Sequence, residues 1–199
     1  MTRALLLDRD GTLVDVVRDE ETGTVSTPFH PRQLRLLPGV VEGLRAARDA
    51  GFGLAIATNQ PGPAKGHFSA AAVTRTNDAL IALLAERGVT IDAIESCIHH
   101  PEGGEGGDAS LVGPCDCRKP KPGMMRAIAQ RLDWDLARSW MVGDTATDVQ
   151  SGVSAGMHTA LVFPAGRCEL CPLRGGPKVA PEVTAATFDA VVTELLKRA

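Results

Sequence analysis

The chain has 199 residues, of which 44% are hydrophobic and 23% charged, and its formal net charge is −3 at pH 7. This length predicts a single domain over residues 1–199 that needs no disulfide or metal simply to fold. The composition is ordinary for a globular protein and excludes collagen, coiled coil and intrinsic disorder. No apolar run approaches the roughly 18 residues of a membrane span, the first run is too short for a signal peptide, and no basic footprint for nucleic acid is present. We therefore expect a cytoplasmic monomer without nucleic-acid or membrane partners.

Short apolar runs alternate with helical patterns along the whole chain. In chain order they predict a strand at 4–7, a helix at 39–50, a strand at 53–57, a helix at 68–87, a strand at 91–98, a helix at 122–132, a strand at 140–142, a helix at 146–155, a strand at 158–163 and a helix at 191–198. Continuous apolar strands separated by helices indicate an α/β fold, a three-layer, Rossmann-like parallel sheet with helices on both faces. The ligand of such a sheet lies at the carboxyl ends of its strands.

Three stretches do not follow this alternation. Residues 14–37 are mixed and turn-rich, which predicts a hairpin or flap after the first strand. Residues 99–114 are dense in Gly and Pro and are flanked by cysteines, which predicts a flexible loop. Residues 167–181 form a third irregular stretch.

The first strand ends in an acidic turn that contains Asp8, Asp10, Gly11 and Thr12. A lone acid at a strand end often only caps a turn. Here two carboxylates are two residues apart and Gly11 allows the chain to turn sharply behind them, so both are expected to point into one pocket. Carboxylates gathered in this way repel one another unless a cation lies among them, and Mg²⁺ prefers such oxygen ligands.

At this point the sequence resembles the haloacid dehalogenase (HAD) superfamily of phosphohydrolases. Four motifs carry the resemblance, in order along nearly the whole chain: Asp8-Arg9-Asp10-Gly11-Thr12, then Thr58 after an apolar run, then Lys119 among prolines, then Gly143-Asp144 followed by Asp148. The resemblance implies a phosphatase that uses an aspartyl-phosphate intermediate.

The resemblance also implies a role for each acidic residue. Asp8 is expected to attack phosphorus, and Asp10 to protonate the leaving alcohol and then activate water. Mg²⁺ is expected to be held by Asp8, the main-chain carbonyl of Asp10 and Asp144. Asp148 either supports the Mg²⁺ shell through water or holds the motif lysine.

Two side chains are expected to hold the phosphate oxygens: the Thr58 hydroxyl and the Lys119 ammonium. Lys119 lies beside Arg118 and Lys121, so an ordinary solvated basic patch is the alternative interpretation. Because Pro120 and Pro122 stiffen this segment, we favour a site, with Lys121 as the competitor for the role of Lys119.

Four of the five cysteine and histidine ligand candidates between residues 97 and 117 form a Cys₃His set: Cys97 and His99, then Cys115 and Cys117. Structural Zn²⁺ takes such a set tetrahedrally, so a zinc loop is predicted at 97–117. The alternatives are buried apolar cysteines plus a loop histidine, or His100 as the ligand. A disulfide between Cys115 and Cys117 is geometrically poor.

The cysteine motifs narrow the resemblance to the D-glycero-D-manno-heptose 1,7-bisphosphate phosphatase and histidinol-phosphate phosphatase group, which lacks a large cap domain. It implies zinc on Cys97, His99, Cys115 and Cys117, and a zinc-pinned loop in place of a cap. It also implies that Asn59, Arg118 and Thr145 contact a small phosphorylated sugar. Thr145 stands where that group usually carries Lys, and residues 16–28 lack its Gly-Tyr-type segment.

The predicted function is Mg²⁺-dependent removal of the 7-phosphate from a heptose 1,7-bisphosphate. Histidinol-phosphate hydrolysis is the alternative reaction, and a zinc-stabilised binding or scaffold protein is the alternative without catalysis. Cys168 and Cys171 form a Cys-x-x-Cys pair outside the zinc loop. It is open to interpretation as half of an intermolecular metal site, a redox pair or two surface thiols.

Overall fold

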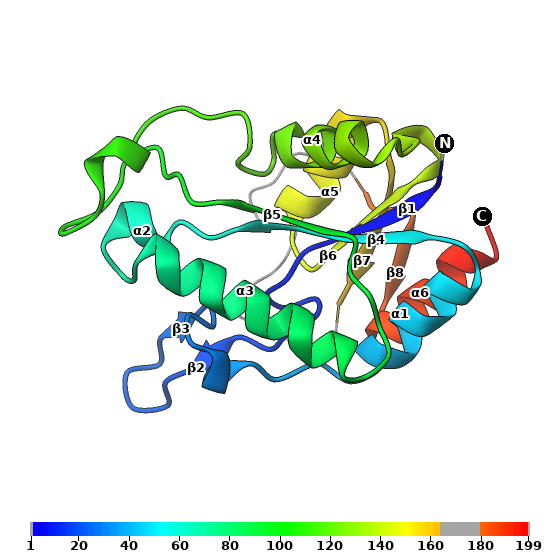
Figure 1. The fold of residues 1–199 in the computed structure, drawn as a ribbon, viewed down its shortest axis with the longest axis horizontal. Coiled ribbons are helices and arrows are strands. Elements are labelled where there is room, and N and C mark those ends of the chain that lie inside the picture. The colour runs from blue at the N-terminus through cyan, green and yellow to red at the C-terminus, as the bar shows by residue number, and fades with distance from the viewer. Residues whose placement is uncertain (1, 164–179, 199) are drawn as a thin grey trace.

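The computed structural model describes residues 2–163 and 180–198, and its centre is a six-stranded parallel sheet (Figure 1). The strands lie side by side in the order β5-β4-β1-β6-β7-β8, with bounds β1 (Ala4–Leu7), β4 (Gly53–Asn59), β5 (Ala93–Cys97), β6 (Trp140–Gly143), β7 (His158–Val162) and β8 (Val183–Ala185). Five of these strands were predicted. The sequence analysis missed β8, since three residues are too few for a periodic pattern.

Alternate residues of the apolar strand β1 supply two separate cores. Leu5 and Leu7 belong to a cluster under helices on one face, and Ala4 and Leu6 belong to a cluster on the other, all with 0% exposure. The first face is covered by α1 (Val40–Asp49), α3 (Ala70–Ala85) and α6 (Phe188–Leu196), and the second by α4 (Gly123–Leu132) and α5 (Ala146–Ala155) (Figure 1). The predicted three-layer α/β fold is thus confirmed.

Helix α6 begins three residues before the predicted start at 191. Thr187 is its N-cap, and Phe188 in its first turn is buried. The ring of Phe188 fills the space beside Gly43 of α1, where a Cβ would lie 2.7 Å from it. Packing against a neighbouring helix therefore extends α6 beyond the segment that the local pattern marks.

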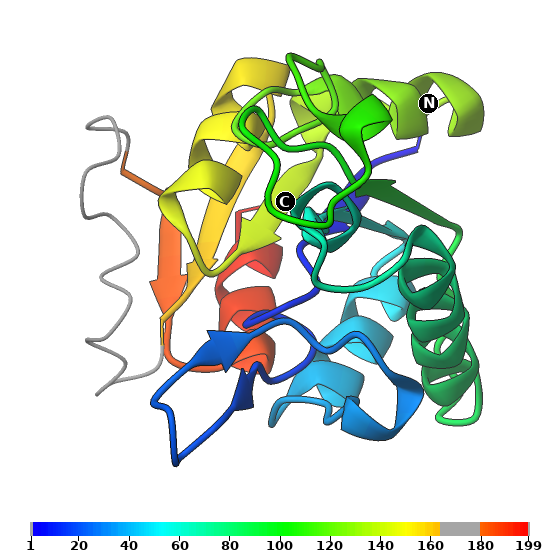
Figure 2. The same ribbon diagram turned by 90° about the vertical axis from the view of Figure 1, so that its left-hand side faces the viewer.

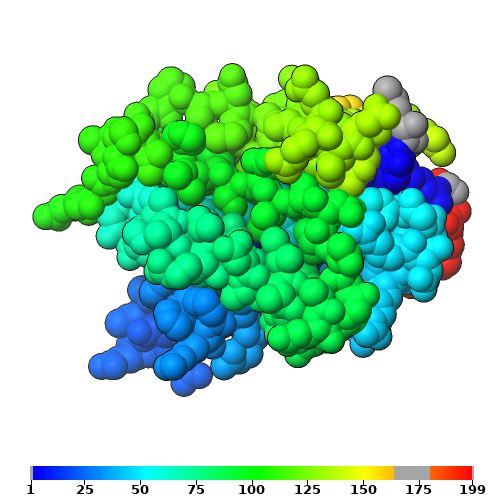
Figure 3. Space-filling view, in the orientation of Figure 1, coloured from blue at the N-terminus to red at the C-terminus, as the bar shows by residue number. Residues whose placement is uncertain are grey.

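Two irregular segments project from the end of the molecule at which the strands have their carboxyl ends. One is the flap, which we define as residues 14–37: it contains the hairpin of β2 (Val17–Arg18) and β3 (Val25–Ser26), then η1 (Pro31–Gln33). The other is the cysteine loop, residues 97–117, which contains η2 (Ala109–Leu111). Figures 2 and 3 show the blue flap and the green cysteine loop on either side of this end, and Figure 1 shows the short helix α2 (Gly62–Lys65) between them.

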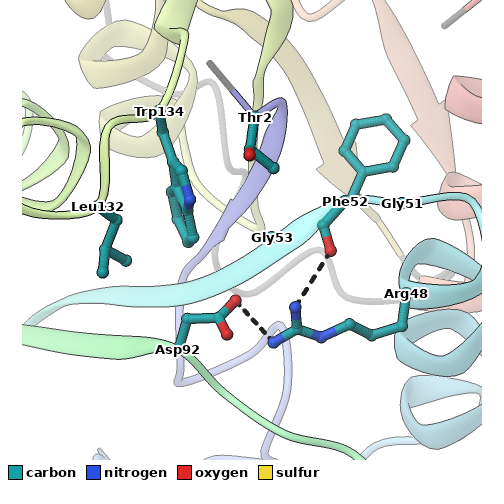
Figure 4. Close-up of a pocket in the computed structure, with 8 residues that line it drawn as sticks. All are labelled: Thr2, Arg48, Gly51, Phe52, Gly53, Asp92, Leu132 and Trp134. Atoms are coloured by element: carbon teal, nitrogen blue, oxygen red, sulfur yellow. Dashed lines mark hydrogen bonds and ion pairs between the residues drawn. The ribbon is translucent and has the colours of Figure 1, made fainter.

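The opposite, amino end of the sheet has a hollow of about 340 Å³ beside Trp134 (Figure 4). Arg48 lies across it, 2.6 Å from the carboxylate of Asp92 and within hydrogen-bond distance of the Phe52 carbonyl. The Trp134 ring occupies the space beside Gly53, where a Cβ would lie 2.4 Å from it. The contacts of Arg48 and Trp134 thus join α1 and the turn before η3 (Leu136–Arg138) to the sheet. The predicted site residues lie at the other end of the sheet.

Within the described ranges, no helix has both the length and the apolar character that a membrane span requires.

Candidate active site and candidate metal centre

Three acidic side chains converge where β1 and β6 end. The backbone N–H of Asp8 donates to the Val142 carbonyl at 2.9 Å, so the pairing of β1 with β6 continues into the site. One carboxylate oxygen from each of Asp8, Asp144 and Asp148 lies within 4.8 Å of the others. The structure therefore brings the acid of the first motif together with the two acids of the fourth, far apart in the sequence.

Lys119 is the cation of this cluster. Its Nζ atom lies 2.7 Å from Asp8 Oδ1 and 2.6 Å from Asp148 Oδ1, and the residue is 3% exposed. Lys121 instead donates to the Cys115 carbonyl, with half of its side chain exposed. Of the two competing lysines, the structure places Lys119 in the acidic cluster.

Burial sets the protonation of the pair. Burial raises the pKa of Asp8 to about 6; Lys119 opposes this rise, whereas Asp148 and Asp10 add to it. Burial alone would lower the pKa of Lys119, but the carboxylates of Asp148 and Asp8 outweigh it and hold that pKa above its ordinary value. The two carboxylates thus favour the charged form of Lys119, and a further positive charge nearby would favour ionised Asp8.

Asp148 directs both carboxylate oxygens at groups of the protein. Its Oδ1 accepts from Lys119, and its Oδ2 accepts from the backbone N–H and the hydroxyl of Thr145 at 3.0 and 2.6 Å. This arrangement is the capping box at the start of α5. The contact with Lys119 is one of the two roles expected of Asp148, and the Thr145 hydroxyl is bound to Asp148.

The Asn59 side chain binds the backbone of Lys119 through two hydrogen bonds. Its amide Nδ2 donates to the Lys119 carbonyl and its Oδ1 accepts from the Lys119 N–H, both at 3.0 Å. The sequence analysis predicted a substrate contact for Asn59, whereas both polar atoms of its side chain here position the motif lysine. Thr58, which precedes it at the end of β4, is 1% exposed, and its hydroxyl accepts from Gln60 at 3.1 Å.

Asp10 lies beside the cluster in a separate set of hydrogen bonds. Its Oδ2 accepts from the Thr27 hydroxyl at 2.5 Å and from Gln60 Nε2 at 2.6 Å, and Arg9 binds both of its oxygens. The sequence analysis did not identify Arg9, Thr27 or Gln60 as site residues. Arg9 lies inside the first motif and Gln60 is two residues after Thr58, but no local pattern showed that they would be buried.

The second cluster joins the end of β5 to the cysteine loop. Cys97 Sγ lies 3.7 Å from Cys115 Sγ and 3.1 Å from Cys117 Sγ, and Cys117 Sγ lies 3.3 Å from His99 Nδ1. All four ligand atoms lie within 4.8 Å of one another. Burial raises the pKa of the Cys97 and Cys117 thiols, which a bound cation would reverse by stabilising the thiolates.

His100 lies outside this group. Its Nδ1 accepts from the backbone N–H groups of Glu102 and Gly103, at 3.2 and 3.1 Å, and so closes a turn of the loop. Arg118 is half-buried, and its guanidinium is 3.4 Å from the His99 carbonyl. Cys168 and Cys171 lie outside the described residues.

The two clusters have the donor chemistry of two different metals. Carboxylate oxygens suit Mg²⁺, and a Cβ on Gly11 would fall 2.0 Å from Asp144 Oδ2, so the turn after β1 is shaped around that carboxylate. Three sulfurs and one imidazole nitrogen suit tetrahedral Zn²⁺. The residues present therefore fit both ions.

Comparisons with known proteins agree with this geometry. A family profile described as HAD-hydrolase-like matches residues 116–187. A D-glycero-beta-D-manno-heptose-1,7-bisphosphate 7-phosphatase of Pseudomonas putida is 34% identical over 98% of this chain and 99% of its own, and one of Escherichia coli K12 is 35% identical over 82% and 80%. A crystal structure of D,D-heptose 1,7-bisphosphate phosphatase from B. bronchiseptica, complexed with magnesium and phosphate, is 32% identical with a TM-score of 0.76 over 99% of both chains.

The fold and the acidic site define the class, a HAD-like phosphatase. An L-2-haloacid dehalogenase from Xanthobacter autotrophicus, 14% identical with a TM-score of 0.60 over the whole of both chains, shares the fold alone. At 34% identity over nearly full lengths, the chain belongs to the family of D-glycero-beta-D-manno-heptose-1,7-bisphosphate 7-phosphatases. The resemblance predicted from the four motifs and the cysteine loop is confirmed.

Proposed function

We propose that this protein removes the 7-phosphate from D-glycero-D-manno-heptose 1,7-bisphosphate, with Mg²⁺, through an aspartyl-phosphate on Asp8. The observation that carries the proposal is the buried contact of Lys119 with both Asp8 and Asp148, beside Asp144. The names of the relatives support the choice of substrate.

The proposed reaction has two chemical steps. In the first, an Asp8 oxygen bonds to phosphorus while the ester bond breaks, and Asp10 gives its proton to the departing alcohol oxygen. In the second, Asp10 takes a proton from water as that water attacks phosphorus, which releases phosphate and restores Asp8 and protonated Asp10. Lys119 and the Thr58 hydroxyl hold the non-bridging oxygens.

Asp8, the main-chain carbonyl of Asp10 and Asp144 would hold Mg²⁺. Bound there, the ion supplies positive charge that offsets the repulsion between the Asp8 carboxylate and an anionic phosphate. Lys119 pairs with both Asp8 and Asp148, so by itself it neutralises only part of the negative charge of the cluster.

The rest of the sugar would occupy a cleft of about 540 Å³ between the flap and α2. Its lining includes Thr27, which also binds Asp10, and Asn59, which follows Thr58, so the cleft adjoins the reacting groups. Arg118, beside Lys119, would contact the second phosphate, because a planar guanidinium suits bidentate contacts. Thr145 would contact substrate from the start of α5.

We propose that Cys97, His99, Cys115 and Cys117 hold one structural Zn²⁺. Their mutual distances support this, and Arg118 and Lys119 follow Cys117 directly. The ion would fix the cysteine loop over the sheet edge, the place that a cap domain would otherwise cover.

The test is a comparison of kcat/KM over a panel: heptose 1,7-bisphosphate, its 1-phosphate and 7-phosphate, other sugar phosphates and histidinol phosphate. We expect the heptose bisphosphate to be preferred and D8N to abolish turnover, with D78N as a control on exposed Asp78 of α3. Preference for histidinol phosphate would contradict the substrate assignment. If no substrate of the panel released phosphate in a Mg²⁺-dependent manner, the alternative function as a binding or scaffold protein would be favoured.

We further propose that the chain acts as a single-domain monomer in the cytoplasm. The net charge of −3 supports a small anionic substrate handled locally by a few cations rather than a nucleic-acid partner. Light scattering on the purified protein tests the monomer.

A further inference from the structure

Arg9 is a buried arginine that the proposed chemistry does not use. It lies between the two carboxylates of the first motif, and its exposure is 0%. A guanidinium cannot lose its charge in a protein, so complete burial is costly unless every donor finds an acceptor. The acceptors of Arg9 therefore show what its charge stabilises.

The guanidinium of Arg9 binds the Asp10 carboxylate through two hydrogen bonds, one to each oxygen. Nε donates to Asp10 Oδ1 at 2.8 Å and Nη2 donates to Oδ2 at 3.2 Å. The two residues are neighbours in the chain, and the turn at Gly11 lets their side chains meet, with the N–H groups of Leu13 and Val14 both bonded to the Arg9 carbonyl. The fork fixes the rotation of the Asp10 carboxylate about its own bond.

The remaining donors of Arg9 reach two other elements. Nη1 donates to Asn77 Oδ1 of α3 at 2.7 Å, and Asn77 in turn donates to Ser96 Oγ of β5. Nη2 donates to the Thr27 hydroxyl at 2.7 Å and to the Pro28 carbonyl at 2.9 Å, both in the flap. Arg9 therefore ties the flap and the scaffold to one carboxylate.

The two oxygens of Asp10 are used unequally. Oδ2 accepts from Arg9, Thr27 and Gln60. Oδ1 accepts, among the described residues, from Arg9 Nε. A carboxylate oxygen has two lone pairs, so Oδ1 is the oxygen that retains one for a proton shared with substrate or water.

We infer that Arg9 is a positioning residue that aims Asp10 Oδ1 at the leaving oxygen and makes this alignment depend on a docked flap. The inference rests on the proposed acid–base role of Asp10. It assigns the proton transfer to one atom: Oδ1 releases the proton to the leaving alcohol and regains one from the attacking water, while Oδ2 stays bound to Arg9, Thr27 and Gln60.

The test uses leaving groups that differ in their need for a proton. A sugar phosphate releases a poor alcohol leaving group, whereas 2,4-dinitrophenyl phosphate releases a phenolate that needs no protonation. The ratio kcat/KM reports steps up to and including formation of the phosphoenzyme. R9M is expected to lower kcat/KM about 100-fold on the sugar phosphate, within the usual contribution of acid–base catalysis, and less than about 5-fold on the dinitrophenyl ester.

A double-mutant cycle separates positioning from general damage. If Arg9 acts through Asp10, then R9M added to D10N costs little beyond D10N alone. R9K keeps the buried charge and loses the planar fork, so it provides a second variant, with the same selective loss, if R9M fails to fold. R18M is the control, because Arg18 is an exposed flap arginine paired with Asp15, and both substrates are expected to react with R18M at the wild-type rate.

Equal losses on both substrates in R9M and R9K, or losses in R9M and D10N that multiply in the double variant, would overturn the inference. An impaired D10N beside fully active R9M and R9K would overturn it while leaving the proposed function intact. Wild-type activity of D10N on the sugar phosphate would overturn both.

Discussion

Asp144 occupies the space in which a side chain on Gly11 would begin. A Cβ built on Gly11 would lie 2.0 Å from Asp144 Oδ2, and Gly11 has φ +83°, which other residues rarely adopt. The turn after β1 and the carboxylate after β6 are therefore shaped around each other. The pairing of β1 with β6 sets the distance between the two strand ends, and the close approach of Gly11 to Asp144 leaves no room for a side chain between them.

Gly11→Ala is expected to displace the Asp144 carboxylate, because the added Cβ would lie 2.0 Å from Asp144 Oδ2. We expect Mg²⁺ binding to weaken by about 10-fold or more, a loss of roughly 1.4 kcal/mol. Calorimetric titration with Mg²⁺ measures the effect. Gly23→Ala is the matched control: Gly23 also has a positive φ, of +66°, but nothing lies within 4 Å of its Cβ position. Equal Mg²⁺ affinity in both variants would contradict the shaping role of Gly11.

Lys119→Met is expected to lower kcat about 100- to 1000-fold, the range seen when one donor to a transition-state oxyanion is removed. It should also destabilise the fold by about 3–5 kcal/mol, since it leaves Asp8 and Asp148 without their buried cation. Lys121→Met, on the exposed lysine two residues later, is expected to change kcat less than about 3-fold. Steady-state kinetics and urea unfolding give both quantities. Similar kinetic losses in the two variants would show that Lys119 has no special role.

The sequence could predict which strand ends carry the site, because in a parallel sheet all carboxyl ends meet at one edge. Asp8, Thr58 and Asp144 lie at the carboxyl ends of neighbouring strands of buried residues, and the pattern of strands along the chain indicates their convergence. Lys119 comes from a loop, so no periodic pattern could place it. Only its position in a family motif indicated that it would reach Asp8.

What the sequence could not show are contacts that depend on how two segments pack. The Asn59 amide is bonded to the Lys119 backbone, and Arg9 is bonded to the flap. In each pair one partner lies in an irregular segment whose path the local pattern does not determine. The strand β8 was missed for a similar reason: its three residues are recognisable as a strand only through their pairing with β7.

The raised pKa of Asp8 predicts a pH dependence of stability without Mg²⁺. Burial raises this pKa from 3.8 to about 6, so the native state binds the proton more tightly than the unfolded chain does. Below about pH 4 Asp8 is protonated in both states, and its ionisation carries no cost. As the pH rises from about 4 through 6, the unfolded chain loses this proton more readily than the native state does, so the free energy of unfolding falls. D8N removes this cost, so we expect D8N to gain stability over the wild type between pH 4 and 7, by about 3 kcal/mol at most.

Urea unfolding at a series of pH values measures this difference, and D78N is the control at an exposed position of α3. Saturating Mg²⁺ should shrink the difference, because a cation stabilises the ionised form of Asp8 in the wild type. A difference between D8N and the wild type that stays constant from pH 4 to 7 would contradict the raised pKa.

Removal of the proposed zinc should affect Lys119 less than the loop that precedes it. Cys117 is two residues from Lys119, but Asn59 holds the Lys119 backbone by two hydrogen bonds that need no metal. Cys115→Ser is therefore expected to lose the zinc, to lower the Tm by roughly 6–12 °C for a loss of about 3 kcal/mol, and to raise KM through Arg118 more than it lowers kcat. Elemental analysis, a thermal melt and kinetics on one preparation test all three, with Cys168→Ser expected to retain about one zinc per chain. If the wild-type protein kept the same Tm with and without zinc, the four side chains would pack together without an ion.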